Sequence, residues 1–417
     1  MNIEINKNLP SAELDHLNLG YMRLNDSAPL IIAQHLGLYE KFGLNVTLHR
    51  EVSWANIRDK TIAGTFDACQ MLAPMPLVTT MGAAGIRAPM ITGLVLSLNG
   101  NGVTVSSSLW SKMNQCTKPD QPLAHLHSNA ENKPINDALA TAKLLRAVLD
   151  KTPGSPLTFA TVHSFSSHTL LLRKWLVAGG IDPDSEVRII VLPPEQMVDS
   201  LAQGVIDGFC VGAPWNTIAV EYGVGIMATT GYEIWNNAPE KVLGVLESWH
   251  SRNPSTHLRL RLALMAACEW LADMDNRKAA VDILSRPEYL DLPADYLRPS
   301  LTGELIYQHS KIAQSRSNYH VFSSYHAGFP WRSQAESILE QFTPLLGKPV
   351  DSDKMASLAQ QCFRSDLYRE AATRAGLSYP EQDYKPEGVH AEPWMLNDNI
   401  ELGSDLMVSA DAPTRNR

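Results

Sequence analysis

The chain has 417 residues, 44% of them hydrophobic and 19% charged, which suggests a folded globular protein of about two or three domains and excludes a fibrous or largely disordered one. Its 35 basic and 44 acidic residues give a net charge of −9 with no run of Lys or Arg, which argues against a nucleic-acid groove. Five widely spaced cysteines indicate neither a disulfide framework nor a CxxC metal or redox site.

The N-terminus, MNIEINKNLPSAELDHLNLG, scatters acidic and amide residues where a secretory signal would carry a basic start and an unbroken apolar stretch. The longest apolar stretches elsewhere, such as 88–96, are shorter than the roughly 18 residues that span a bilayer. We therefore expect a cytoplasmic protein with no membrane and no direct nucleic-acid partner.

The first elements in chain order predict a β-α-β unit, with a strand at 17–22, a helix at 29–42 and a strand at 45–48. Asp26 or Ser27 is expected to cap the helix, with Pro29 in its first turn and Gly43 at its end. Further strands are expected at 65–71 and 88–98, with a helix at 77–85 between them. This alternation predicts a largely parallel sheet.

A second α/β series follows residues 116–134, which are polar and predict a surface excursion. Helices are expected at 135–150, 167–178 and 195–203, and strands at 157–162, 187–192 and 206–211. From residue 239 onward the pattern is mostly helical. After residue 384 little periodicity remains, which predicts a wrapping or disordered tail.

Several enzyme signatures do not occur in the sequence: GxxxxGK[ST], GxSxG and HExxH. His163 and His168 are five residues apart with no acid between them, so a zinc site is not indicated. The GxG at residues 100–102 lacks the third glycine of the dinucleotide-binding motif, so it indicates a dinucleotide-binding site only weakly. We expect no enzyme activity, no metal and no cofactor.

Several motifs in one order resemble the nitrate- and bicarbonate-binding proteins of cyanobacterial ABC transporters. The resemblance covers most of the chain to about residue 270, and more loosely to about residue 372. The motifs are DSAPL at 26–30, GLYEKFGL at 37–44, SWANIRD at 53–59, LAPMP at 72–76, RKWL at 173–176, LPPEQMV at 192–198, VGAPWN at 211–216 and PEK at 239–241.

The resemblance implies an α/β, two-lobed, periplasmic-binding-protein-like fold of type II, with the ligand in a cleft between lobes that close around a hinge. Lobe I would comprise residues 1–103 and 238–383, lobe II residues 104–237, and the tail residues 384–417. Without a visible export signal, the chain looks like the NasS-type cytoplasmic sensors. In these, nitrate or nitrite releases a NasT-type RNA-binding antiterminator.

Nitrate is a planar monoanion with three acceptor oxygens, so its site needs a positive charge, fixed donors and a flat wall. The resemblance implies that Lys241 supplies the charge, Trp54 an indole donor and flat face, and His168 an imidazole at a helix N-terminus. Bicarbonate-specific relatives carry an acidic, calcium-assisting residue at the position of Lys241, so Lys241 favours nitrate or nitrite without metal. Taken singly, these residue types are more often a core Trp, a solvated Lys and a buried His.

Three further residues match the pocket of the family. Asn101 stands where the transporter receptors carry Gln, so the amide is kept but is one methylene shorter. Pro194 and Val211 match apolar positions that line the pocket, although both also fit ordinary packing.

Three function classes remain open: a sensor acting through a protein partner, the binding component of a nitrate transporter, and an enzyme on the same fold, like relatives in pyrimidine synthesis. We rank them in that order. An upstream reading frame encoding a signal peptide would favour the second, and a reactive His and Cys cluster the third.

Overall fold

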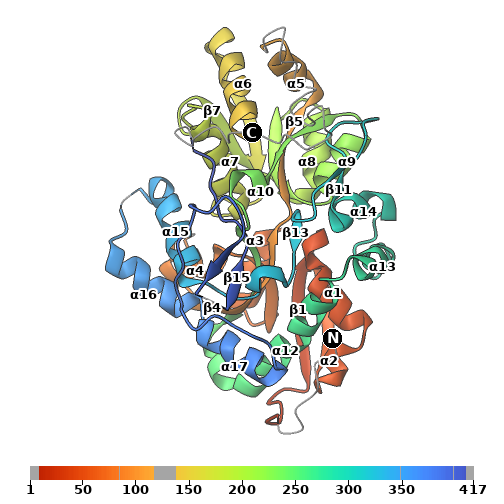
Figure 1. Ribbon diagram of the computed structural model, residues 1–417, viewed down its shortest axis with the longest axis vertical. Helices are drawn as coiled ribbons and strands as arrows, with labels where there is room; N and C mark the ends of the chain where they lie inside the picture. Colours follow the sequence, from red (N-terminus) through yellow and green to blue (C-terminus); the bar gives the residue numbers. More distant parts are fainter. Residues whose placement is uncertain (1–8, 84, 117–137, 348, 398, 410–417) are drawn as a thin grey trace.

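The computed structural model consists of two α/β lobes that follow one another along the long axis of the molecule (Figure 1). It describes residues 9–83, 85–116, 138–347, 349–397 and 399–409. We call the lobe whose sheet contains β1 (His16–Met22) lobe I, and the lobe whose sheet contains β5 (Asn101–Ser106) lobe II.

The sheet of lobe I has six strands in the order β13-β4-β10-β3-β1-β2. β1 is parallel to both neighbours, whereas β10 is antiparallel to β3 and β4. Every residue of β3 and β4 is buried, as expected for strands covered on both faces. The strands are β1 (His16–Met22), β2 (Asn45–Glu51), β3 (Ala68–Leu72), β4 (Met90–Asn99), β10 (Pro239–Leu246) and β13 (His320–Val321).

The sheet of lobe II has five strands in the order β7-β6-β8-β5-β9, with β5 antiparallel to both neighbours. Each sheet therefore has one strand that is antiparallel to its neighbours, and it is the first strand after the chain crosses from the other lobe: β5 in lobe II and β10 in lobe I. The strands are β5 (Asn101–Ser106), β6 (Leu157–Thr161), β7 (Val187–Val191), β8 (Gly208–Gly212) and β9 (Gly225–Thr230).

Helices cover both sheets, and the chain after β10 is mostly helical (Figure 1). Before β5 these are η1 (Asn25–Ser27), α1 (Ala28–His35), α2 (Leu38–Lys41), α3 (Trp54–Ile62) and α4 (Met75–Met81). In lobe II they are α5 (Ser107–Asn114), α6 (Ala138–Lys151), α7 (Ser167–Ala178), η3 (Pro194–Gln196), α8 (Met197–Ala202), α9 (Trp215–Glu221) and α10 (Gly231–Ile234). After β10 they are α11 (Glu247–Arg252), α12 (Pro254–Trp270), α13 (Met274–Leu284), α14 (Ala294–Thr302), η4 (Ser324–His326), α15 (Arg332–Phe342), η5 (Thr343–Leu346), α16 (Ser352–Cys362) and α17 (Ser365–Ala375).

The chain passes between the lobes at two points that use left-handed backbone. The first crossing is Gly100 between β4 and β5, with φ +88°, after Asn99 with φ +60°. A Cβ at Gly100 would overlap the ring of His320, so only glycine fits there. The return crossing runs through Asn237, with φ +53°, into β10.

The C-terminal segment binds the second crossing. The backbone N–H of Asn236 donates to Leu406 O (2.9 Å), and the N–H of Val408 donates to Ile234 O (2.8 Å). This segment comes directly after a small hairpin of β14 (Trp394–Leu396) and β15 (Ile400–Leu402). Another small hairpin, of β11 (Glu304–Leu305) and β12 (Gln314–Ser315), lies earlier in the chain. We call residues 403–408 the strap.

The lobes are packed against each other. Arg23 of lobe I forms an ion pair of 3.2 Å with Glu195 of lobe II, and Asn25 N donates to Ala213 O (2.9 Å). One contiguous apolar cluster includes side chains of both lobes, among them Trp54 and Val211. The structure therefore represents a closed arrangement.

The structure corrects several predictions. Both sheets are mixed rather than largely parallel, because β5 and β10 run against their neighbours. β10 itself lies where the sequence predicted mostly helix. The helix expected at 29–42 is two helices, since Gly37 adopts φ +65° between α1 and α2. Residues 117–137, which make up most of the predicted surface excursion, lie outside the described residues. The predicted lobe boundaries at 103/104 and 237/238 stay predictions.

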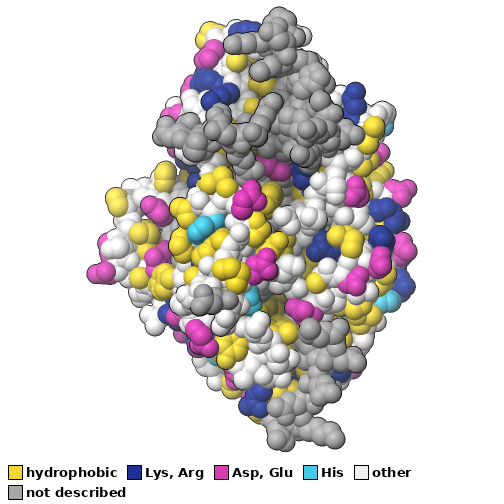
Figure 2. Space-filling model, in the orientation of Figure 1, with side chains coloured by type: hydrophobic (Ala, Val, Ile, Leu, Met, Phe, Trp, Pro, Cys, Tyr) yellow, Lys and Arg dark blue, Asp and Glu magenta, His cyan; other side chains and the backbone are white. Residues whose placement is uncertain are grey.

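None of the helices in the described part of the chain combines the length and apolar character that a membrane crossing needs. On the face shown in Figure 2, the described Lys and Arg side chains are scattered rather than gathered into one basic patch.

Candidate functional site

A buried group of charged side chains lies between the lobes, centred on Lys241. Its Nζ is 2.8 Å from Oδ2 of Asp26 and 2.5 Å from Oε1 of Glu240, and all three side chains have no solvent exposure. We call Asp26, Asn101, His168, Glu240 and Lys241 the interlobe cluster.

An irregular start of β10 explains how neighbouring residues meet in this cluster. Successive side chains of a regular strand point to opposite faces, so Glu240 and Lys241 would normally separate. The pairing of β10 with β4 shifts register on both sides of Lys241, as at a β-bulge. The Glu240 carboxylate thereby accepts a hydrogen bond from the Lys241 ammonium.

Lobe II contributes two side chains to Glu240. Nδ2 of Asn101, the first residue of β5, donates to Oε2 of Glu240 (2.6 Å). Nε2 of His168 lies 3.4 Å from Oε1 of Glu240. His168 is in the first turn of α7, whose N-cap Ser166 accepts a hydrogen bond from Thr169 N. Glu240 thus joins lobe I to lobe II.

Trp54 forms an aromatic wall beside the cluster. It is the first residue of α3, fixed by Ser53, whose hydroxyl accepts a hydrogen bond from Asn56 N at the helix start. The Nζ of Lys241 lies 5.4 Å from the centre of the indole ring, a cation–π distance. The side chain is 1% exposed.

The other two predicted residues are buried in lobe II. Val211 lies in β8 opposite Gly102, and its carbonyl accepts a hydrogen bond from Asn216. Pro194 begins η3, next to the Glu195 that pairs with Arg23 across the lobes. Among the contacts of the described residues, none joins Pro194 or Val211 to Lys241 or Glu240. The structure therefore brings together Trp54, Asn101, His168 and Lys241.

Asp26 or Ser27 was predicted to cap the helix, and neither side chain makes a capping hydrogen bond. Oδ1 of Asp26 accepts a hydrogen bond from Nε2 of Gln70 (2.7 Å), and its other oxygen faces Lys241. Ser27 occupies the N-cap position of α1 but makes no capping hydrogen bond; its hydroxyl donates to Met22 O (2.6 Å). The sequence offered one indication that Asp26 belongs to the site. It follows the carboxyl end of the predicted strand at 17–22, and polar residues at such positions often form ligand sites in α/β folds.

Glu240 was also missed as a site residue, and it changes the interpretation of Lys241. The sequence predicted an ammonium available for an anion. In the structure two carboxylates already neutralise it, and a buried ammonium needs such partners.

Burial and charge pairing act together on the pKa values of the cluster. Burial raises the pKa of Asp26 despite the opposing effect of Lys241. Burial also acts to raise the pKa of Glu240, but Lys241 and His168 bring it below its ordinary value. For Lys241, burial acts to lower the pKa, whereas Asp26 and Glu240 raise it. Burial lowers the pKa of His168 to about 4, so its imidazole is neutral at pH 7.

Five polar atoms at the cluster are buried without a hydrogen-bond partner in the described part of the chain: Nε1 of Trp54, Oδ1 of Asn101, both ring nitrogens of His168 and Oδ2 of Asp26. Of these, Nε2 of His168 and Oδ2 of Asp26 have ion-pair contacts with Glu240 and Lys241. A buried polar atom without a partner costs about 1–3 kcal/mol, so native proteins rarely leave several together. A small polar ligand can supply the missing hydrogen bonds.

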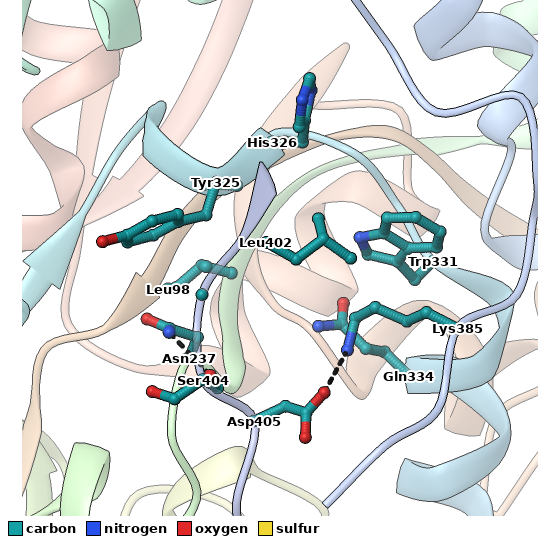
Figure 3. Close-up of a pocket in the computed structure, with 12 residues that line it drawn as sticks. Leu98, Asn237, Tyr325, His326, Trp331, Gln334, Lys385, Leu402, Ser404 and Asp405 are labelled. Carbon is teal, nitrogen blue, oxygen red and sulfur yellow. Dashed lines mark hydrogen bonds and ion pairs between the residues drawn. The ribbon is translucent and has the colours of Figure 1, made fainter. Parts of the chain in front are cut away.

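A small pocket lies at the hinge. Figure 3 shows Leu98 of β4 and Asn237 of the second crossing beside Ser404 and Asp405 of the strap. Its volume of about 20 Å³ suits a single water. Lys385, 2.7 Å from Glu387, and Asp405 form a buried ionic group at its edge. This pocket belongs to the packing of the hinge.

A larger cavity of about 390 Å³ lies on lobe II between β7 and η5. Its main polar feature is the bidentate pair of Arg173 and Asp184, at 2.7 and 2.6 Å. Elsewhere in the described ranges, no group of three or more His, Cys, Asp or Glu side chains is arranged to hold a metal ion.

Comparisons with known proteins agree on one family. The profile of the NMT1-like family matches residues 11–285. The nitrate import ATP-binding protein NrtC of Synechocystis is 36% identical over 372 residues, covering 88% of this chain and 52% of that protein. The chain thus spans about half the length of the first curated relatives that it matches. The nitrate/nitrite binding protein NrtA of Synechococcus elongatus is 31% identical, with 87% and 79% covered.

The fold has a solved counterpart. The crystal structure of the periplasmic nitrate-binding protein NrtA from Synechocystis superimposes with a TM-score of 0.76 at 27% identity, covering 90% of this chain and 92% of that one. This likeness confirms the predicted α/β, two-lobed fold of type II periplasmic binding proteins.

Proposed function

Since this chain belongs to the NMT1-like family and is similar to NrtA over most of both proteins, we propose that it binds nitrate or nitrite between its lobes. The similar proteins of comparable length are binding proteins, not enzymes. The proposed site is the interlobe cluster with Trp54 as its wall.

The convergence of three predicted residues on Lys241, itself predicted, and on its neighbour Glu240 carries this proposal. Trp54, Asn101 and His168 come from three distant segments, yet each contacts Glu240 or Lys241. They come from both lobes, so a ligand bound there favours the closed arrangement.

The chemistry of the cluster suits a small oxyanion. The indole N–H of Trp54 has no partner in the described structure, and an oxyanion accepts a hydrogen bond from such a donor. Lys241 supplies a positive charge beside this donor, although Asp26 and Glu240 offset that charge in the structure.

Bicarbonate is the second candidate, and the two carboxylates favour it. Nitrate only accepts hydrogen bonds, whereas bicarbonate also donates one through its O–H. Glu240 and Asp26 are acceptors, so a ligand with its own proton meets a partner there.

We further propose that the bound anion controls a NasT-type antiterminator, as the sequence resemblance to NasS-type sensors suggests. For this role, the open and closed arrangements must differ in affinity for that partner. The alternative is the binding component of a nitrate transporter, which would engage a membrane complex instead.

Ligand binding is tested by melting temperature with nitrate, nitrite, bicarbonate and chloride. A ligand at 100 times its Kd stabilises the folded protein by about 2.7 kcal/mol. We expect nitrate and nitrite to raise the melting temperature and chloride to leave it unchanged. A rise with bicarbonate alone would select the second candidate, and no rise with any of them would refute the site.

The partner is tested by size-exclusion chromatography with a purified NasT-type antiterminator during a nitrate titration. We expect a complex without nitrate that dissociates as nitrate saturates the protein. A complex that forms equally at all concentrations would refute the release mechanism, and no complex would refute the partner.

A further inference from the structure

Resting on the proposed anion site, we propose that Asp26 takes up a proton when nitrate binds, so that the site binds the anion and a proton together. Asp26 would then determine which charge state of a ligand the protein accepts.

The charge of the cluster leads to this conclusion. Among the described residues, Lys241 is the one ammonium that contacts the carboxylates of Asp26 and Glu240, and none of these three side chains is exposed to water. With both carboxylates ionised and His168 neutral, the cluster has one excess negative charge. Adding nitrate would leave two negative charges in a region without solvent, where charge repulsion is least screened. A proton on one carboxylate removes this excess.

In the part of the chain that the structure describes, the groups around the two carboxylates supply no other positive charge. Around Asp26 these are Gln70 of β3, Glu240 and Lys241 of β10 and Tyr319 before β13, and Cys210 of β8 faces Glu240 and Lys241. Around Glu240 they include Asn101, Ser167 and His168 of lobe II. His320 of β13 also senses Lys241 and Glu240, and burial lowers its pKa to about 3, so it is neutral.

Asp26 is the better proton acceptor of the two carboxylates. Glu240 is held ionised by Lys241, by the Asn101 amide and by the nearby imidazole. Asp26 has one neutral donor, Gln70, besides Lys241. A proton on Oδ2 of Asp26 would release the ammonium toward an anion while Glu240 still pairs with it. The raised pKa of Asp26 agrees with this assignment.

The closing experiment measures nitrate binding and proton uptake in wild type, Asp26→Asn and Asp282→Asn. Nitrate is the probe because it stays unprotonated at these pH values, so any proton taken up belongs to the protein. Calorimetry gives the Kd at pH 6, 7 and 8, and a pH electrode in weakly buffered solution counts protons per nitrate. Asp282 is the control because its side chain is 75% exposed on α13.

We expect about one proton per nitrate and a Kd that rises up to about tenfold per pH unit in wild type and Asp282→Asn. Asp26→Asn mimics the protonated acid, so it should bind nitrate at pH 8 as wild type does at pH 6, without proton uptake. Wild-type binding without proton uptake would overturn this inference and leave the proposed function standing. Uptake that persists in Asp26→Asn would overturn the assignment to Asp26, whereas no nitrate binding at any pH would overturn the proposed function itself.

Discussion

Asn99 donates a hydrogen bond of 3.1 Å from its side-chain amide to the side-chain oxygen of Asn237, which links the two crossings between the lobes. Both residues have positive φ, and the amide of Asn237 also donates to Ser404 O of the strap (2.8 Å). One side chain therefore joins both crossings to the strap.

Asn237→Ala should destabilise the protein by about 1–3 kcal/mol, because it removes both hydrogen bonds and places alanine at positive φ. Urea unfolding measures the loss. Asn237→Gly is the matched variant, since glycine tolerates φ +53° and loses only the hydrogen bonds. If alanine and glycine gave equal losses, backbone strain would not contribute at this position.

Trp54→Phe should keep the fold and weaken nitrate binding by about 0.5–1.5 kcal/mol, because it removes an indole donor and retains an aromatic wall. Trp54→Ala is unsuitable, since the side chain is 1% exposed and its loss would leave a cavity. Calorimetry with nitrate measures the effect, and Trp270→Phe on α12 is the control. Unchanged affinity in Trp54→Phe would remove the indole N–H from the proposed site.

Lys241→Met should destabilise the unliganded protein by about 3–5 kcal/mol, because it leaves two buried carboxylates without a counter-charge. Adding Asp26→Asn should restore part of the loss, which thermal unfolding of the single and double variants would measure. The loss should shrink at lower pH. Without Lys241, the two buried carboxyls have raised pKa values in the folded protein, and the protein loses stability as the pH rises through those values. Equal stability of Lys241→Met and wild type would mean that the ammonium is not balancing these acids.

Buried histidines should make the protein less stable below about pH 6.5. Burial lowers the pKa of His163 and His168 to about 4 and that of His320 to about 3. Between about pH 6.5 and 4 these histidines are protonated in the unfolded chain but not in the folded protein. The free energy of unfolding therefore falls as the pH drops through this range, by up to about 1.4 kcal/mol per pH unit for each histidine.

Urea unfolding between pH 7.5 and 5 checks this slope. His163→Asn is the informative variant, because asparagine can keep the hydrogen bond that the ring accepts from Phe165 N. It should reduce the slope by one proton. A slope identical to that of wild type would show that His163 does not titrate in this way.

The sequence by itself determined the elements that depend on local pattern. The strand at 17–22 and the helix at 167–178 lie where predicted, because their apolar spacing and, for α7, the N-cap residue are encoded locally. The order of motifs also predicted the family and the two-lobed fold, and it selected four residues that converge in space.

Only the tertiary structure decided what those residues face. Asp26 looked like a helix cap, and Lys241 looked like a free cation, because sequence separation hides that β1 and β10 lie two strands apart in one sheet. β10 was missed because its Pro239 start and its bulge interrupt a strand pattern, while its long-range pairing with β3 and β4 stabilises it. The charge of the candidate site depends on which distant segments meet, and local propensity does not contain that information.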